Sequence, residues 1–186
     1  MNQTFSFEES KEVASHVVHP SHTDVFSHPL KKTYFEPLLT VDVACFMPAY
    51  EGVKLHFIAT DVSLDVVEFS LDDENRYTLT KINGEVVDLT SDNFYDDLES
   101  LPEEEKFSEL KTIKNAAIVP APHAYEGEIR LSIGAPDWLQ SGWVDCDFAS
   151  DGYQFIGQLT ANTLFRTLFL FYDHQKRRVL QIIECT

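Results

Sequence analysis

Residues 76–89 read RYTLTKINGEVVDL, two strand-like segments on either side of the dipeptide Asn83-Gly84. Asn-Gly most readily supplies the two positive φ angles of a type I′ turn, which joins antiparallel strands through two residues. Residues 76–82 and 85–89 are therefore predicted to form the arms of a β-hairpin. No other stretch of the chain indicates its local structure as strongly.

Strand patterns continue on both sides of this hairpin. Upstream, Leu39, Val41, Val43 and Cys45 alternate with their neighbours, and residues 53–60 follow a turn and predict another strand. Downstream, four further strands are predicted, at residues 129–133, 153–160, 167–172 and 178–184. The last three are expected to form an antiparallel meander, with residues 173–176 as its final hairpin turn.

Helices are predicted in two places. Residues 8–18 favour a short helix that Pro20 ends, because proline lacks the amide donor and disfavours helix in the residue before it. Residues 91–100 favour a second helix, and Pro102 is suited to open a third. The sequence therefore predicts an α+β fold of mainly antiparallel sheet with a few short helices. We expect a single domain over residues 1–186, with possible sub-lobes at 1–115 and 116–186.

The composition limits the class of protein. A chain of 186 residues with 44% hydrophobic and 12% aromatic residues can bury the core of one domain. The N-terminus lacks a secretory signal pattern, and no apolar run approaches the length of a membrane helix. Cys45, Cys146 and Cys185 are odd in number and far apart, which is typical of thiols in a reducing compartment. A cytoplasmic protein is expected.

The charge is concentrated in one stretch. Residues 61–109 contain sixteen Asp and Glu against Arg76, Lys81 and Lys106, and the whole chain has a formal net charge of −17. This charge disfavours nucleic acid and membrane surfaces as partners and favours a basic protein. The residues expected to contact such a partner are Asp72, Asp73, Glu74, Asp92, Phe94, Tyr95, Asp96, Asp97, Glu103, Glu104 and Glu105. The alternative is a solvated face, in which residues 103–105 only compensate a helix dipole.

No motif for catalysis or metal binding is evident. The chain contains neither a Gly-x-Ser-x-Gly nucleophile elbow nor a phosphate-binding glycine loop. His16, His19 and His22 have a spacing of three, but Pro20 disrupts the helix that would align them on a zinc ion. The basic run Lys176-Arg177-Arg178 is interpreted as a solvated turn. We therefore expect no enzyme activity, no cofactor and no metal.

A family resemblance enters in the C-terminal third. The segments IGAPDWLQ at 133–140, FIGQL at 155–159 and LFLFY at 168–172 resemble the C-terminal part of the YwqG-like family of uncharacterised bacterial domains. Many members of that family carry Cys-x-x-Cys pairs, whereas only Cys146 and Cys185 remain in this region of the chain. Two isolated cysteines cannot complete a tetrahedral zinc site, so the resemblance implies the family fold without its metal.

Two functions remain open. The first is an immunity protein that binds a basic toxin effector, above all a nuclease, and occludes it through the acidic surface; domains resembling the YwqG-like group look similar to those beside bacterial toxins. The second is a small ligand-binding module or enzyme with a pocket lined by Trp138, Gln140, Gln158 and Tyr172. Trp138 itself is interpreted as a core anchor rather than a ligand contact, because its ring buries a large area.

Overall fold

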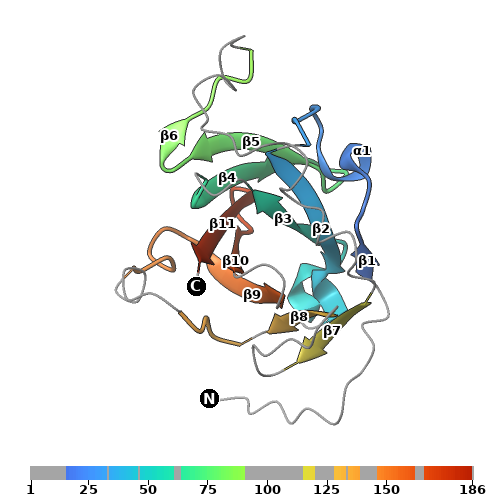
Figure 1. The fold of residues 1–186 in the computed structure, drawn as a ribbon. Coiled ribbons are helices and arrows are strands. Elements are labelled where there is room, and N and C mark those ends of the chain that lie inside the picture. Colours follow the sequence, from blue (N-terminus) through green and yellow to red (C-terminus); the bar gives the residue numbers. More distant parts are fainter. Residues whose placement is uncertain are drawn as a thin grey trace.

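The computed structural model describes residues 16–32, 34–45, 47–60, 64–90, 115–119, 128–132, 134–138, 146–161 and 166–185. These residues form two β-sheets, of eight and three strands (Figure 1). Their helical part consists of α1 (His22–Val25) and the 3-10 helices η1 (Val43–Cys45) and η2 (Pro48–Tyr50). The predicted mainly antiparallel architecture is confirmed, while the described helices are few and short. No helix among these residues has the length and apolar character needed to cross a membrane.

The large sheet has the strand order β6-β5-β4-β11-β10-β9-β8-β7. Neighbouring strands are antiparallel except for β7 and β8, which are parallel. Its strands are β4 (Val66–Leu71), β5 (Tyr77–Ile82), β6 (Glu85–Val86), β7 (Asn115–Val119), β8 (Glu128–Ser132), β9 (Gln154–Ala161), β10 (Arg166–Asp173) and β11 (Arg178–Cys185). Because β4 pairs with β11, strands from both sides of the sub-lobe boundary expected near residue 115 share one sheet.

The small sheet has the order β1-β2-β3 and is antiparallel throughout. Its strands are β1 (His16–Val18), β2 (Phe35–Asp42) and β3 (Lys54–Thr60). Figure 1 shows β2 and β3 beside the curved large sheet. The prediction of a helix reaching residue 18 is wrong at its C-terminal end, because residues 16–18 pair with residues 39–41 of β2. Residues 8–15 lie outside the described ranges.

The predicted hairpin is confirmed at its turn and first arm, but its second arm, expected over residues 85–89, is the shorter strand Glu85–Val86. Asn83 and Gly84 have φ angles of 49° and 86°, and Ile82 pairs with Glu85 across the turn. The antiparallel meander β9-β10-β11 is confirmed as well. Strands β4 and β7 had no specific prediction, and the helices expected over residues 91–100 and from Pro102 onward lie outside the described ranges.

The large sheet buries different residues on its two faces because side chains alternate along a strand. On β4, Val67, Phe69 and Leu71 face the small sheet and join the main core between the two sheets. Glu68 lies between them in sequence and therefore points to the opposite face. That opposite face has its own apolar cluster, formed by Tyr153, Phe169, Phe171, Leu180 and Ile182.

Side chains of the large sheet also bond the free edge of β3. The Gln181 amide donates to the Ile58 carbonyl at 2.7 Å and accepts from the Ile58 amide at 2.9 Å. The Tyr77 hydroxyl accepts a hydrogen bond from the His56 amide at 2.7 Å. These buried contacts satisfy backbone groups that an edge strand would otherwise leave unpaired inside the protein.

Candidate partner-binding surface

The structure places the predicted partner-binding residues in two groups. Asp72, Asp73 and Glu74 lie in the turn between β4 and β5. The other predicted residues lie outside the described ranges and stay predictions: Asp92, Phe94, Tyr95, Asp96, Asp97, Glu103, Glu104 and Glu105. The β4–β5 turn is therefore the part of the predicted surface whose geometry is known.

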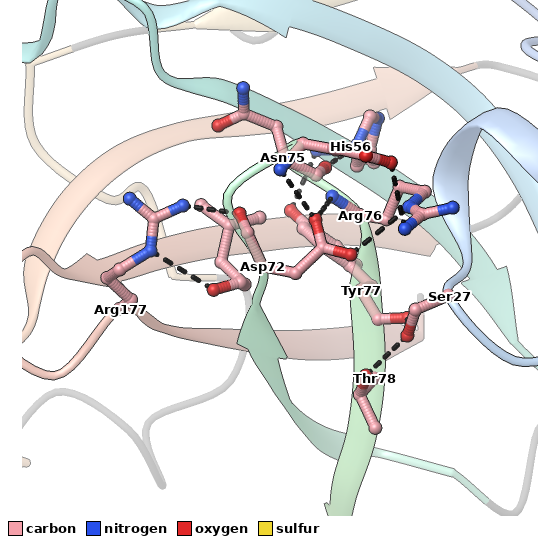
Figure 2. Close-up of polar contacts among 10 residues, drawn as sticks. Ser27, His56, Asp72, Asn75, Arg76, Tyr77, Thr78 and Arg177 are labelled. Carbon is pink, nitrogen blue, oxygen red and sulfur yellow. Dashed lines mark hydrogen bonds and ion pairs between the residues drawn. The ribbon is translucent and has the colours of Figure 1, made fainter.

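Asp72 organises this turn (Figure 2). Its Oδ1 accepts hydrogen bonds from the backbone amides of Glu74 and Arg76, at 2.9 and 2.8 Å. Its Oδ2 accepts one from Arg76 Nε at 3.1 Å. Partial burial raises the pKa of Asp72, but these hydrogen bonds and the charge of Arg76 outweigh it, so the pKa is lowered. Asp72 thus holds the turn together from within, and its predicted contact with a partner stays a prediction.

Arg177 holds the same turn from the neighbouring β10–β11 connection. Its Nε donates to the Leu71 carbonyl at 3.1 Å, and its Nη2 donates to the Asp72 carbonyl. Figure 2 shows Arg177 and Arg76 approaching Asp72 from different sides. The interpretation of Lys176-Arg177-Arg178 as a solvated turn is therefore wrong for Arg177, whose guanidinium satisfies carbonyls at the end of β4.

His56 joins the turn to the small sheet. Its Nε2 lies 2.7 Å from the Asn75 carbonyl, and a carbonyl can only accept, so Nε2 carries the proton. In the neutral ring Nδ1 then accepts from the Thr40 hydroxyl at 2.8 Å. Burial lowers the pKa of His56 to about 4, which the bond to Asn75 only partly opposes. The turn is consequently fixed by a histidine that stays neutral near pH 7.

Two of the three carboxylates in the turn are well exposed, whereas the side chain of Asp72 is 32% exposed. Glu74 is 70% exposed and forms an ion pair of 2.8 Å with Arg76. Asp73 is exposed as well. The turn contains the carboxylates Asp72, Asp73 and Glu74 and the cation Arg76, and Arg177 binds to it. The formal charges of these five side chains sum to about −1. Such a weak excess is a poor electrostatic target on its own.

A second ionic cluster lies on the opposite face of the large sheet. Glu68 accepts from the Tyr153 hydroxyl at 2.6 Å and pairs with Lys81 at 3.1 Å. Arg178 pairs with Asp173 at 2.9 Å and stacks over the Tyr153 ring, 5.1 Å from its centre. Asp173 is only 3% exposed, so Arg178 supplies a charge that this buried carboxylate needs.

The pKa shifts in this cluster follow from these contacts. Burial raises the pKa of Glu68, but hydrogen bonds from Tyr153 and Lys81 outweigh it and lower the pKa overall. The same balance lowers the pKa of Asp173, through the Lys176 amide and Arg178. Burial and the bond to Glu68 raise the pKa of Tyr153. Glu68 and Asp173 are therefore both ionised near pH 7. The cluster is a set of structural ion pairs rather than an acid–base pair.

Unlike two of those in the β4–β5 turn, the described carboxylates around the β5–β6 hairpin are not paired with arginine. Asp65, Glu85 and Asp88 are exposed around it, and the nearest cation along the strands, Lys81, is already paired with Glu68. Val86 is 81% exposed. This end of the sheet thus presents carboxylates that no neighbouring cation in residues 64–90 offsets, together with an apolar side chain.

The alternative pocket is not assembled from its predicted residues. Trp138 stacks on Phe169 at a centroid distance of 4.4 Å, which agrees with its interpretation as a core anchor. The Gln158 side chain accepts from the Asp137 amide at 2.7 Å on the same face. Tyr172 is fully buried in the main core on the other face of the sheet. Trp138 and Tyr172 therefore cannot line one pocket, and Gln140 lies outside the described ranges.

Metal binding has no support in the described ranges. Within them, no group of three or more His, Cys, Asp or Glu side chains is arranged to hold an ion. His16 and His19 are not on a helix, and His22 in α1 lies 3.4 Å from Glu36.

Comparison of the chain with protein-family models, with curated proteins and with solved structures finds no match. The YwqG-like resemblance of the C-terminal third therefore stays a prediction.

The sequence did not indicate the polar contacts of Glu68, Tyr153, Arg177 and Arg178. Glu68 carried a readable signal, because it is the one charged residue within the apolar run VVEFSL and so had to find a partner. Its partners are Lys81, Tyr153 and, at 3.7 Å, Arg178, and no local pattern connects those positions. Arg177 gave no signal of its own.

Proposed function

We propose that this protein is a cytoplasmic immunity protein that binds a basic toxin effector, such as a nuclease, and occludes it through an acidic surface. The observation that supports this proposal is that the lysine and arginine side chains on and next to β4, β5 and β11 already have bonding partners within the protein. Each is bonded to an internal carboxylate, to the β4–β5 turn or to a backbone carbonyl: Arg76, Lys81, Lys176, Arg177 and Arg178.

This internal pairing matters for the net charge of −17. Lys81, Lys176 and Arg178 pair with Glu68 or Asp173. Arg76 pairs with Asp72 and with the exposed Glu74, so these cations are less able to screen the other exposed carboxylates. Exposed carboxylates such as Asp73, Glu85 and Asp88 then set the field that an approaching protein meets. A field of this sign attracts a basic protein and repels phosphate, as an inhibitor of a nucleic-acid-cleaving toxin requires.

The mechanism is occlusion. Carboxylates of this protein pair with lysine and arginine side chains of the toxin that would otherwise bind its phosphate-bearing substrate. An apolar contact near the centre of the interface supplies most of the affinity. Association is expected to be fast at low salt and to slow steeply as salt screens the charges.

The direct test is co-expression. If an adjacent reading frame encodes a large secreted protein with a toxic C-terminal domain, that domain is expressed with or without this protein, and growth is followed. Rescue of growth is the expected result. If the wild-type protein is produced in folded form and growth is not rescued by it, the immunity function is wrong.

A second measurement tests the acidic surface. We expect the variant Asp96→Lys, Asp97→Lys, Glu103→Lys, Glu104→Lys to slow association with the toxin at least about tenfold at low salt. The control Asp137→Lys, Asp151→Lys changes exposed carboxylates in the C-terminal section and is expected to slow it far less. Equal effects per charge in the two variants would mean that net charge, rather than an acidic docking face, steers the partner.

A further inference from the structure

Among the described residues, no strand pairs with the outer edge of β6. Strand β6 ends the strand order, and its inner side pairs with β5 through Lys81–Val86 and Ile82–Glu85. The Val87 amide donates to the Thr80 carbonyl at 3.0 Å, so the Thr80–Val87 pair is hydrogen-bonded. Hydrogen-bonded and non-bonded pairs alternate along antiparallel strands, so the backbone amide and carbonyl of Val86 point away from β5.

The side chain of Val86 makes this edge unusual. It is 81% exposed, whereas its neighbours Val87 and Leu89 pack against the main core. The other large apolar side chain that is exposed in the described ranges is Val17, at 53%. Val86 thus combines an outward backbone with an outward apolar side chain at the end of a sheet.

The edge is held in an extended shape before any partner arrives. The Asn83 amide donates to the Val66 carbonyl at 2.7 Å, and the Asn83 side-chain oxygen accepts from the Val66 amide at 3.0 Å. After the strand, Asp88 Oδ1 accepts from the Thr90 amide at 2.9 Å and turns the chain. A preformed edge loses little conformational entropy on binding.

The charge at this edge selects the occupant. Asp65, Glu85 and Asp88 are exposed, while residues 64–90 contain only Arg76, in the distant β4–β5 turn, and Lys81, which is paired with Glu68. Two copies of this edge would bring like charges together, which opposes pairing of the protein with itself. A strand carrying lysine or arginine meets opposite charges instead.

We propose that the outer edge of β6 docks an extended, lysine- or arginine-rich segment of the protein partner, which pairs with the Val86 backbone and adds a strand to the large sheet. This inference rests on the proposed function in taking the partner to be basic. Val86 supplies the backbone bonds and the apolar contact, and the surrounding carboxylates pair with the cations of the segment. Since β6 has two residues, the added pairing is short and the charges supply much of the specificity.

The test uses a synthetic peptide of alternating lysine and valine, seven residues long and blocked at both ends. Its control has the same sequence with alternate backbone amides N-methylated, which keeps the charge and removes the hydrogen bonds of one edge. We expect the unmodified peptide to slow amide hydrogen exchange at Val86 and to bind about tenfold more tightly than its N-methylated form. Equal affinities, or protection elsewhere without protection of Val86, would overturn strand addition at this edge.

Matched variants of the full chain localise the effect. Val86→Thr and Glu85→Lys are expected to weaken peptide binding several-fold, whereas Val17→Thr, at the exposed valine of β1, leaves it unchanged. Equal loss in Val86→Thr and Val17→Thr would also reject the proposal.

Toxin rescue separates this inference from the proposed function. If Val86→Thr and Glu85→Lys together rescue growth and bind the toxin as well as the wild type, the edge is not the docking site while immunity stands. If the wild type fails to rescue growth, immunity falls, and protection of Val86 by the peptide still decides whether the edge accepts a basic strand.

Discussion

Strand β5 begins at one acidic turn and ends at another, and the two turns differ in what becomes of their carboxylates. At the β4–β5 turn, Asp72 is bonded to the turn backbone and to Arg76, and Arg177 reaches in from a distant part of the chain. At the β5–β6 turn, Glu85 and Asp88 remain exposed. The comparison teaches that a run of acidic residues in sequence does not reveal which charges a partner meets. The tertiary contacts decide that.

The largest expected effect on stability is at a carboxylate that is paired inside the protein, Asp173. Arg178→Met leaves the nearly buried Asp173 without its closest cation, which is expected to cost about 3–5 kcal/mol in the free energy of unfolding. Urea denaturation at pH 7 measures it. The control Lys176→Met removes a more exposed ammonium 3.9 Å from the same carboxylate and should cost less than about 1 kcal/mol. Similar losses in the two variants would show that Asp173 does not depend on Arg178.

The next effect concerns pH. Burial lowers the pKa of His56 to about 4 in the folded protein, while an unfolded histidine has a pKa of about 6.5. Between these values the unfolded state binds more protons, so this contribution to stability is complete above about pH 6.5 and is lost as pH falls toward 4. It amounts to about 3 kcal/mol. His56→Gln should flatten the fall in stability measured between pH 7 and pH 4, and an unchanged slope would show that His56 does not cause it.

A smaller effect is expected within the β4–β5 turn. Asp72→Ala removes the acceptor of two backbone amides and one Arg76 bond, so it should cost about 1–2 kcal/mol by thermal or chemical denaturation. Asp72→Asn retains the oxygen that caps the amides and should cost less. Asp73→Ala, one residue along, serves as the control and should change stability by less than about 0.5 kcal/mol. If Asp72→Ala is equally harmless, the turn does not depend on its carboxylate.

The smallest effect is expected at the open turn. Glu85→Lys reverses an exposed charge, so the free energy of unfolding should change by no more than about 0.5 kcal/mol. A loss above about 1 kcal/mol would mean that Glu85 has an internal role and that the two turns are alike. Denaturation curves of Glu85→Lys and Arg178→Met, recorded side by side, therefore measure how much more an internally paired charge contributes to stability than an exposed one.

Local signals in the sequence predicted local structure well. The Asn83-Gly84 turn and the meander β9-β10-β11 were both recognisable, because turn chemistry and strand periodicity act over a few residues. The short strand β1 was misread as the end of a helix. Its three residues carry too little periodicity to indicate a strand, and its structure comes from pairing with β2.

The candidate site was predicted less completely. The exposure of Asp73 and Glu74 followed from their place in a turn, but the internal role of Asp72 depends on where the turn folds back. Arg177 contacts Leu71 across 106 positions of the chain, and no periodicity carries that information. Long-range polar contacts therefore redistributed the charge in a way that the sequence alone did not indicate.

The bond between Gln181 and Ile58 has a consequence for biosynthesis. The two residues are separated by 123 positions, so β3 leaves the ribosome long before the amide that satisfies its edge. At about 5–20 residues per second the delay is about 6–25 s. During that interval β3 and β4 lack their later partners, and contacts of such high sequence separation also slow folding. The nascent chain is accordingly expected to need chaperone protection until β11 has emerged.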